Sequence, residues 1–168
     1  MASPPLTPLA AAALHVGSPE RVLEIECGEG DGALFLAREF PSARVRGVDR
    51  DEGAVRRASA RVGLDPEGRV AFKAGRPRRL PFPDDQFDLL VAVDARPAAA
   101  ESARVLRRGG FLVLVSTARH EPLGGISGRL ASARLRRRGF VAIWSELAGD
   151  GSFSVERLGD GVAAPASL

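Results

Sequence analysis

The sequence predicts a single α/β domain built on a doubly wound parallel sheet. Apolar runs typical of buried strands alternate along the chain with segments of helical periodicity, which is the pattern of βα units. The run Asp88-Leu89-Leu90-Val91-Ala92-Val93 is almost wholly apolar, as expected for a strand buried on both faces. A chain of 168 residues, 45% of them hydrophobic, is long enough for one domain that buries roughly 70% of its unfolded surface.

Proline and glycine residues separate the predicted strands and helices from one another. Pro41, Pro66 and Gly109-Gly110 separate strand candidates from helix candidates. Strands are expected over residues 21–25, 44–48, 70–73, 88–93 and 111–116, and helices over residues 32–39, 52–62, 98–107 and 126–138. Residues 140–146 and 152–157 flank a glycine-containing turn and predict a terminal hairpin. We expect a helical extension over residues 1–18, a domain over 19–158 and a disordered tail over 159–168.

The composition excludes several classes of protein. Cys27 is the only cysteine, so a disulfide framework is excluded, and with two histidines it forms no zinc-ligand spacing. No apolar run approaches the roughly 20 residues that span a bilayer, and the first residues lack the basic region of a signal peptide. We therefore expect a cytoplasmic protein that does not associate with membranes, either a monomer or a homodimer.

The basic charge raises the question of nucleic-acid binding. The net charge is +3 and the pI is 10.3, but Lys73 is the only lysine and 21 acids are present. Residues 101–140 hold nine arginines against two acids and end in Arg136-Arg137-Arg138. A solvated helix end explains this cluster, since no aromatic residues interleave with it, and the alternative is binding to RNA or an acidic partner.

A glycine-rich turn carries the first chemical signal. The segment Val22-Leu23-Glu24-Ile25-Glu26-Cys27-Gly28-Glu29-Gly30-Asp31-Gly32 predicts a strand, a turn and a helix that Asp31 could cap. Glycines let a ligand approach the backbone at the switch point of such a sheet. Asp49 lies nineteen residues after Gly30, at the end of the next strand, where a carboxylate can accept both hydroxyls of a ribose. This spacing predicts a nucleoside-containing cofactor; the alternative is that the glycines only form a turn and Asp49 only caps the next helix.

The order of these motifs resembles the class I S-adenosylmethionine (SAM) dependent methyltransferases, in particular the small-molecule group called type 11. Glu24, Gly28 and Gly30 resemble the glycine-rich first motif, and Gly47-Val48-Asp49 resembles the ribose-binding acid. Residues 80–88 resemble the approach to the fourth strand, and residues 104–111 the turn into the fifth. These segments favour this family over nicotinamide-binding domains, although Gly28-x-Gly30-x-x-Ala33 also fits the dinucleotide fingerprint.

The resemblance implies a Rossmann-like, seven-stranded sheet with the last strand antiparallel, and SAM across the carboxyl ends of the first, second and fourth strands. It implies methyl transfer to an unidentified small-molecule acceptor, for which Asp94 is the candidate orienting or catalytic residue and His15 and His120 are weaker ones. An alternative role for Asp94 is to cap the helix after Pro97. The implied cofactor contacts are Glu24, Glu26, Cys27, Gly28, Gly30, Asp49, Arg50, Arg76, Leu80 and Asp94.

Two residues depart from the family pattern at cofactor contacts. Glu26 stands where the first glycine of the turn is expected. Its unpaired carboxylate would repel the methionyl carboxylate of SAM, and the alternative is that it attracts the ammonium or the sulfonium. Arg76 stands where an acid is expected to accept from the adenine amino group, and a guanidinium has only donors. The sequence therefore leaves two functions open: an active small-molecule methyltransferase, or a methyltransferase-like module that binds another ligand or a partner protein without catalysis.

Overall fold

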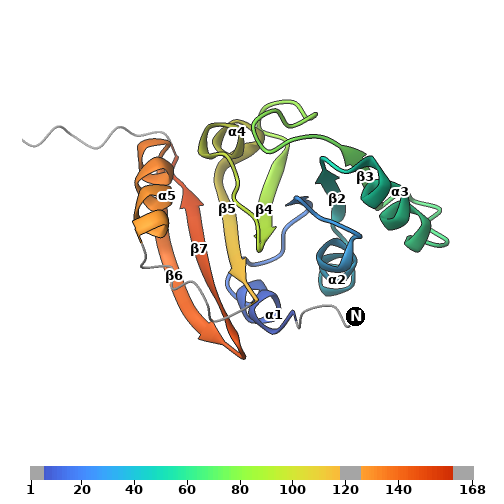
Figure 1. The fold of residues 1–168 in the computed structure, drawn as a ribbon, viewed down its shortest axis with the longest axis horizontal. Helices are drawn as coiled ribbons and strands as arrows, with labels where there is room; N and C mark the ends of the chain where they lie inside the picture. Colours follow the sequence, from blue (N-terminus) through green and yellow to red (C-terminus); the bar gives the residue numbers. More distant parts are fainter. Residues whose placement is uncertain (1–5, 118–125, 161–168) are drawn as a thin grey trace, which may run out of the picture.

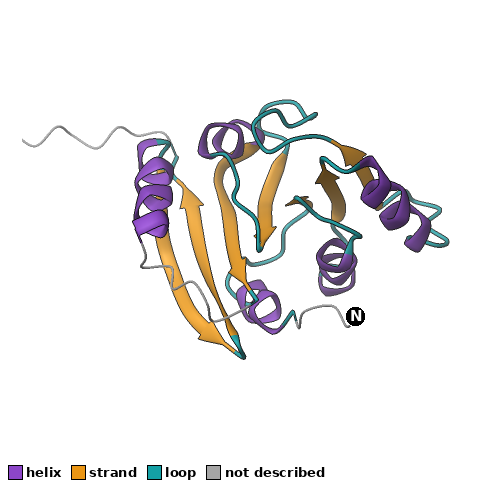
Figure 2. Cartoon of the chain, in the orientation of Figure 1, coloured by secondary structure: helices purple, strands orange, loops and turns teal. Residues whose placement is uncertain are grey.

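The fold is a seven-stranded mixed sheet flanked by helices (Figures 1 and 2). A computed structural model describes residues 6–117 and 126–160. Its strands are β1 (Arg21–Ile25), β2 (Arg44–Asp49), β3 (Val70–Ala74), β4 (Phe87–Val93), β5 (Leu106–Ser116), β6 (Phe140–Ala148) and β7 (Gly151–Leu158). Its helices are α1 (Thr7–Ala13), α2 (Asp31–Glu39), α3 (Glu52–Arg61), α4 (Ala99–Val105) and α5 (Ile126–Arg137).

The strand order is β3-β2-β1-β4-β5-β7-β6, and only β7 runs antiparallel to its neighbours. This confirms the predicted fold class, with the Glu24 strand near the centre of the sheet and the hairpin at one edge. The order reverses between β1 and β4, so the carboxyl ends of these two strands border the crevice in which doubly wound sheets bind ligands.

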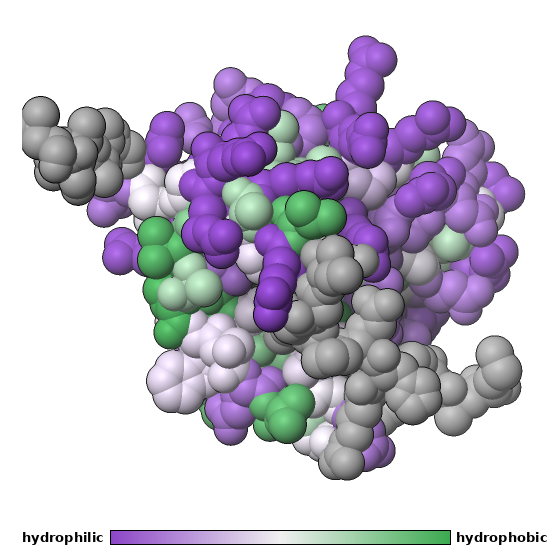
Figure 3. Space-filling view, turned by 60° about the vertical axis from the view of Figure 1, so that its left-hand side comes forward, coloured by the Kyte–Doolittle hydropathy of each residue, from purple (hydrophilic) through white to green (hydrophobic). Residues whose placement is uncertain are grey.

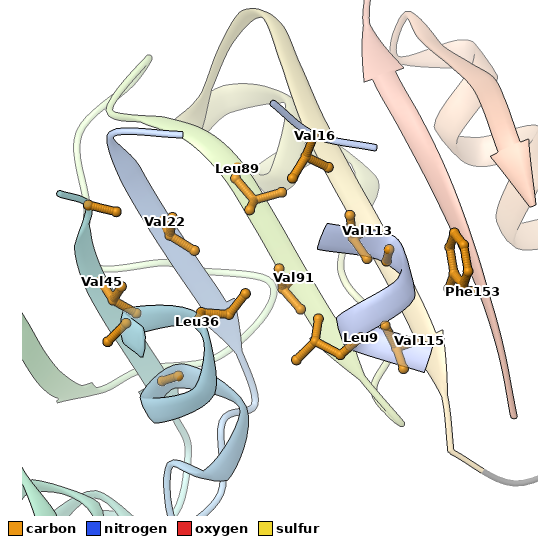
Figure 4. Packing of buried hydrophobic residues seen from close by; sticks show 14 of the residues in the cluster. Leu9, Val16, Val22, Leu36, Val45, Leu89, Val91, Val113, Val115 and Phe153 are labelled. Atoms are coloured by element: carbon orange, nitrogen blue, oxygen red, sulfur yellow. The ribbon is translucent and has the colours of Figure 1, made fainter. Parts of the chain in front are cut away.

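Two apolar clusters hold the helices to the sheet. On one face, Leu9 of α1 and Leu36 of α2 pack against strand residues such as Val91 and Val113 (Figure 4). On the other face, Val105 of α4 and Leu135 of α5 pack against strand residues of the second cluster. Because Leu9 is fully buried in the first cluster, the N-terminal helix belongs to the same core as the sheet. No helix within the described ranges is long and apolar enough to cross a membrane.

The observed elements differ in several details from the predicted ones, most of all where the fifth strand begins at Leu106 and not at residue 111. The fourth helix ends at Val105 rather than Arg107, because Leu106 is extended (φ −87°, ψ 135°) and already pairs with Phe87 of β4. Asp31 does not cap α2, since Gly30 occupies the cap position without a side-chain bond and Asp31 is the first helical residue. The hairpin strands are longer than predicted and meet at Gly149-Asp150. The predicted tail lies outside the described residues from residue 161 onward.

An irregular loop, residues 75–86, makes the crossover from β3 to β4 where a helix often does so. Arg104 of α4 fixes this loop: its guanidinium donates to the carbonyls of Leu80 (3.2 Å) and Phe82 (2.9 Å). The same guanidinium pairs with Asp84 (2.8 Å) and Glu101 (2.7 Å). The two family-like segments that contain Leu80 and Arg104 are therefore parts of one hydrogen-bonded unit.

Replacing Arg104 should destabilise the fold through this loop. Charge-assisted hydrogen bonds contribute about 1.5 to 3 kcal/mol each when fully buried, and this side chain is 30% exposed. We therefore expect Arg104→Met to lower the free energy of unfolding by about 2 kcal/mol in urea denaturation. Arg107→Met, which changes an arginine outside this network, is the control. Equal stability of the two variants would contradict the role of Arg104.

Candidate functional site

The turn after β1 leaves one glycine open to a ligand. Gly28 (φ +54°) and Gly30 (φ +90°) both have left-handed backbones. A Cβ atom at Gly30 would lie 2.8 Å from the ring of Phe72, so this glycine permits packing of the turn against β3. A Cβ atom at Gly28 would meet nothing within 4 Å. Gly28 is therefore the position where a ligand can approach the backbone closely.

Asp49, the last residue of β2, fixes this turn. Its Oδ2 atom accepts the Gly28 N–H (2.8 Å) and its Oδ1 atom accepts the Asp51 N–H (2.9 Å). Asp51, not Asp49, caps α3 by accepting the Gly53 N–H. Each carboxylate oxygen of Asp49 keeps a lone pair, and the side chain is only half-buried. The carboxylate is therefore held in place and can still accept hydroxyl groups from a ligand.

Glu24 lies beneath the turn rather than at its surface. The residue is 3% exposed, and a Cβ atom at Gly32 would lie 2.2 Å from its Oε1 atom. Burial raises the pKa of Glu24 to about 8, partly opposed by a hydrogen bond with the Ala33 backbone, and Oε2 has no partner among the described residues. Glu24 thus shapes the start of α2 from inside and does not present its carboxylate to the surface.

Two other predicted contacts are also core residues. Cys27 is 6% exposed, and burial raises the pKa of its thiol to about 12, which keeps it protonated. Leu80 is 4% exposed and packs in the second apolar cluster, while its N–H donates to Glu101 (2.7 Å). The side chain of Leu80 therefore lies in the core beside α4, and its assignment as a cofactor contact stays a prediction.

The carboxylate of Glu26 is paired, which corrects the expectation of an unpaired charge. The Arg50 Nε–H donates to Glu26 Oε1 (3.0 Å), and a second guanidinium nitrogen contacts the same oxygen. This pair raises the pKa of Arg50. Glu26 itself has a left-handed backbone (φ +53°), the conformation that a glycine would adopt without strain. The charge of Glu26 is therefore compensated from the end of β2.

A cleft brings together three of the predicted residues. It opens between the loops after β3 and β4 and helix α5, and Arg50, Arg76 and Asp94 line it. Arg76 is exposed and forms an isolated antiparallel bridge with Arg79. Gly28 and Asp49 are not among the lining residues, but the Glu26–Arg50 pair connects the turn to the cleft. The remaining predicted residues are buried and support the site from the core: Glu24, Cys27, Gly30 and Leu80.

Asp94 is oriented by a residue that sequence reasoning missed. Its Oδ1 atom accepts the Thr117 N–H (2.8 Å), and the Thr117 hydroxyl donates to Oδ2. Asp94 does not cap α4, whose cap residue Ala98 makes no side-chain bond. The one signal in the sequence that could have suggested Thr117 as a site residue is its position directly after the strand that ends at Ser116. The exposed carboxylate of Asp94 is therefore fixed at the carboxyl ends of β4 and β5.

His15 contacts aromatic residues outside this site. His15 stacks on Trp144, with ring centroids 4.7 Å apart, and lies near Phe153. These aromatic neighbours belong to the edge hairpin. His120 lies outside the described residues.

The buried carboxyl of Glu24 predicts a pH dependence of stability. The unfolded chain releases this proton above pH 4.5, whereas the folded protein retains it up to about pH 8, so stability falls between these values. Relative to Glu24→Gln, the wild type should lose up to about 1.4 kcal/mol of unfolding free energy per pH unit in this range, measured by urea denaturation. In the exposed control Glu67→Gln, the unfolding free energy should change with pH as it does in the wild type. If the unfolding free energies of Glu24→Gln and the wild type changed with pH in the same way, the prediction of a raised pKa for Glu24 would be contradicted.

Comparison with known proteins places this site in a family context. The chain is 33% identical over 136 residues to a phthiotriol/phenolphthiotriol dimycocerosates methyltransferase of Mycobacterium ulcerans, covering 74% of this chain and 48% of the relative. It is 36% identical over 104 residues to a fatty-acid O-methyltransferase of Mycolicibacterium smegmatis, covering 56% of this chain and 36% of the relative. The chain thus spans about half or less of the length of these curated relatives.

A solved structure and a family model agree with these relatives. A SAM dependent methyltransferase from Aquifex aeolicus has a TM-score of 0.72 at 18% identity, with 90% of this chain and 89% of that chain covered, and so shares the fold. The family model of the methyltransferase domain matches residues 22–110, which include the glycine turn, Asp49 and Asp94. The chain therefore belongs to the methyltransferase domain family, within the class I methyltransferases.

Proposed function

We propose that the protein is a SAM-dependent methyltransferase that transfers a methyl group to a small-molecule acceptor. The observation that carries this proposal is the position of the Asp49 carboxylate at the switch point of the sheet. The carboxylate accepts the N–H of Gly28, and Gly28 is also the glycine that is open to a ligand. A fixed acceptor at the end of β2 suits the two hydroxyls of a ribose. Gly28, Gly30 and Asp49 would hold the nucleoside end and the turn-facing part of SAM.

The charges around the turn are compatible with SAM. The methionyl end of SAM carries a carboxylate, an ammonium and a sulfonium. Because Arg50 compensates Glu26, a carboxylate near the turn meets an ion pair instead of a lone negative charge. Arg76 cannot accept from the adenine amino group, but it is exposed and able to turn away from it or stack on it. The residues present therefore fit SAM better than the sequence alone indicated.

The residues at the carboxyl ends of β4 and β5 would act on the acceptor. When bound, SAM supplies a methyl group that is activated by the adjacent positive sulfur. The protein's contribution is then to hold the acceptor in line with that group. Asp94 lines the cleft, and Thr117 fixes its carboxylate. We therefore assign to Asp94 the role of orienting the methyl acceptor. Ionised, it could also accept a proton from a hydroxyl acceptor.

The relatives support a small-molecule acceptor in the coarse sense. Their names specify methyl transfer to phthiotriol dimycocerosates, to fatty acids and, for a protein of Geobacter sulfurreducens, in ubiquinone/menaquinone biosynthesis.

The non-catalytic alternative predicts a different result in calorimetry with SAM and S-adenosylhomocysteine. An enzyme must bind both, whereas a module that has lost the cofactor site binds neither.

Asp49 should dominate cofactor affinity. We expect Asp49→Asn, which keeps an acceptor for Gly28 but removes the charge, to weaken SAM binding roughly 10- to 100-fold, as expected for the loss of about 1.5 to 3 kcal/mol. Calorimetric titration measures this effect, and circular dichroism verifies folding. Asp51→Asn, whose side chain is directed to α3, should bind SAM normally. Normal affinity of folded Asp49→Asn would place the cofactor elsewhere.

The Glu26–Arg50 pair gives a second test of cofactor binding. Arg50→Gln leaves the charge of Glu26 uncompensated, so the dissociation constants of SAM and S-adenosylhomocysteine should rise about three- to tenfold. Glu26→Gln should cause no such loss, and the double variant should behave like Glu26→Gln. If Arg50→Gln binds as the wild type does while Glu26→Gln binds worse, Glu26 itself attracts the cofactor's positive groups.

A further inference from the structure

The cleft beside the proposed cofactor site is unusually rich in arginine. Its lining includes the loop after β3 and helix α5, which lie far apart in the sequence. Among its lining residues are six arginines that form no ion pair within the described part of the chain: Arg76, Arg78, Arg79, Arg134, Arg137 and Arg138. All six are exposed. The cleft therefore carries a concentrated positive charge.

The acids of the cleft offset only part of this charge. Of the lining residues, two are acidic, and both are engaged by other groups. Asp94 accepts from Thr117, and Glu101 pairs with Arg104 (2.7 Å) outside the cleft lining. That pairing also holds the pKa of Glu101 below its usual value. Within the described residues, the six arginines therefore outnumber the acids of the lining, and none of them forms an ion pair.

A solvated helix end does not explain this arrangement. Arg137 and Arg138 lie three and four positions after Arg134, so the three arginines lie on one side of the end of α5, with Arg138 directly after its last residue. Arg136, in contrast, interacts with Glu156 of β7 and does not line the cleft. The helix dipole favours basic residues in the last turn of α5, but it gives no reason for the arginines of the loop after β3. Two independent segments supply cations to one cavity.

The same cleft has an apolar part. Leu130 of α5 is 57% exposed, and it lines the cleft together with Leu114 of β5 and Pro97. Leu130 lies one turn before Arg134, so the face of α5 changes from apolar to cationic along its length. Figure 3, in which the side of α5 and β6 comes forward, shows hydrophilic side chains gathered next to hydrophobic ones. A ligand matching this surface has an anionic end and an apolar body.

We propose that this cleft binds an anionic amphiphile, a molecule with a phosphate or carboxylate group on an apolar body, and that this is the class of the methyl acceptor. The second part rests on the proposed function. Guanidinium groups bind carboxylates and phosphates with two parallel hydrogen bonds, and both the loop after β3 and the end of α5 contribute guanidinium groups to the cleft lining. Asp94 and Arg50 line the same cleft, and Arg50 pairs with Glu26 of the glycine turn, so a bound acceptor would adjoin the proposed cofactor site.

The lining disfavours a nucleic acid as the ligand. Proteins that hold single-stranded nucleic acid combine positive charge with aromatic side chains on which bases stack. The described residues that line the cleft include no aromatic side chain. Apolar side chains such as Leu130 offer more contact to an aliphatic or prenyl body than to bases. We therefore do not propose RNA as the ligand, and the experiment below includes RNA binding as a result that would contradict the proposal.

The test is calorimetric titration of the full chain with octyl phosphate, octanoate and octanol. The two anions should bind at least tenfold more tightly than octanol, and the stronger of them identifies the preferred head group. In the variant Arg134→Gln/Arg137→Gln/Arg138→Gln, anion affinity should fall at least tenfold while the affinity for octanol stays unchanged. The charge-matched control is Arg38→Gln/Arg44→Gln/Arg56→Gln, which changes exposed arginines outside the cleft and should bind the anions normally.

Three results would overturn the proposal. One is equal binding of octyl phosphate, octanoate and octanol, and another is an equal loss in the control variant, which would mean nonspecific charge attraction. The third is tighter binding of a short single-stranded RNA than of either anion, abolished by the α5 variant. Titration with SAM separates this proposal from the proposed function. Anion binding without SAM binding would retain the ligand class and reject the methyl transfer.

Discussion

Asp49 joins the carboxyl ends of three neighbouring strands, and the geometry of the site depends on it. Its side chain accepts the Gly28 N–H after β1 and the Asp51 N–H before α3, while its carbonyl accepts the Gly75 N–H after β3. A carboxylate at this position therefore positions the glycine turn before any ligand arrives. Preorganisation of this kind reduces the entropy lost on binding. The same residue that would recognise a ribose also holds the surface on which the ribose would lie.

The departure of Glu26 from the family pattern illustrates how a local charge depends on its partner. An acid in a left-handed turn adds both strain and negative charge at a position where glycine is free of both. The guanidinium of Arg50 lies on the neighbouring strand end and pairs with it. Because β1 and β2 are parallel and in register at Ile25 and Val48, residues just after them are brought side by side. The substitution at residue 26 is thus understandable only together with residue 50.

The sequence predicted the strands and helices well because apolar periodicity and glycine punctuation are local signals. It also predicted Asp49 beside the turn, since parallel strands end on the same edge of a sheet. It could not predict that Leu80 is buried, because a motif does not reveal which of its residues face the core. Nor could it predict the contacts of Arg104 with residues 80–84 or of Thr117 with Asp94, which join segments separated by about twenty residues. Such contacts depend on the path of irregular loops.

Two sets of arginines in this protein differ in what they contact, and this difference separates stability from recognition. Arg57 and Arg61 of α3 pair with Glu29 and Asp31 beside the glycine turn, and Arg104 organises the crossover loop. Each of these guanidinium groups has its acceptors within the fold. The cleft arginines of the loop after β3 and of the end of α5 have no acid of the described chain to pair with, although acids are almost as numerous as basic residues overall. Since repulsion among unpaired cations opposes folding, their convergence on one cavity is best explained by an anion that the protein binds there.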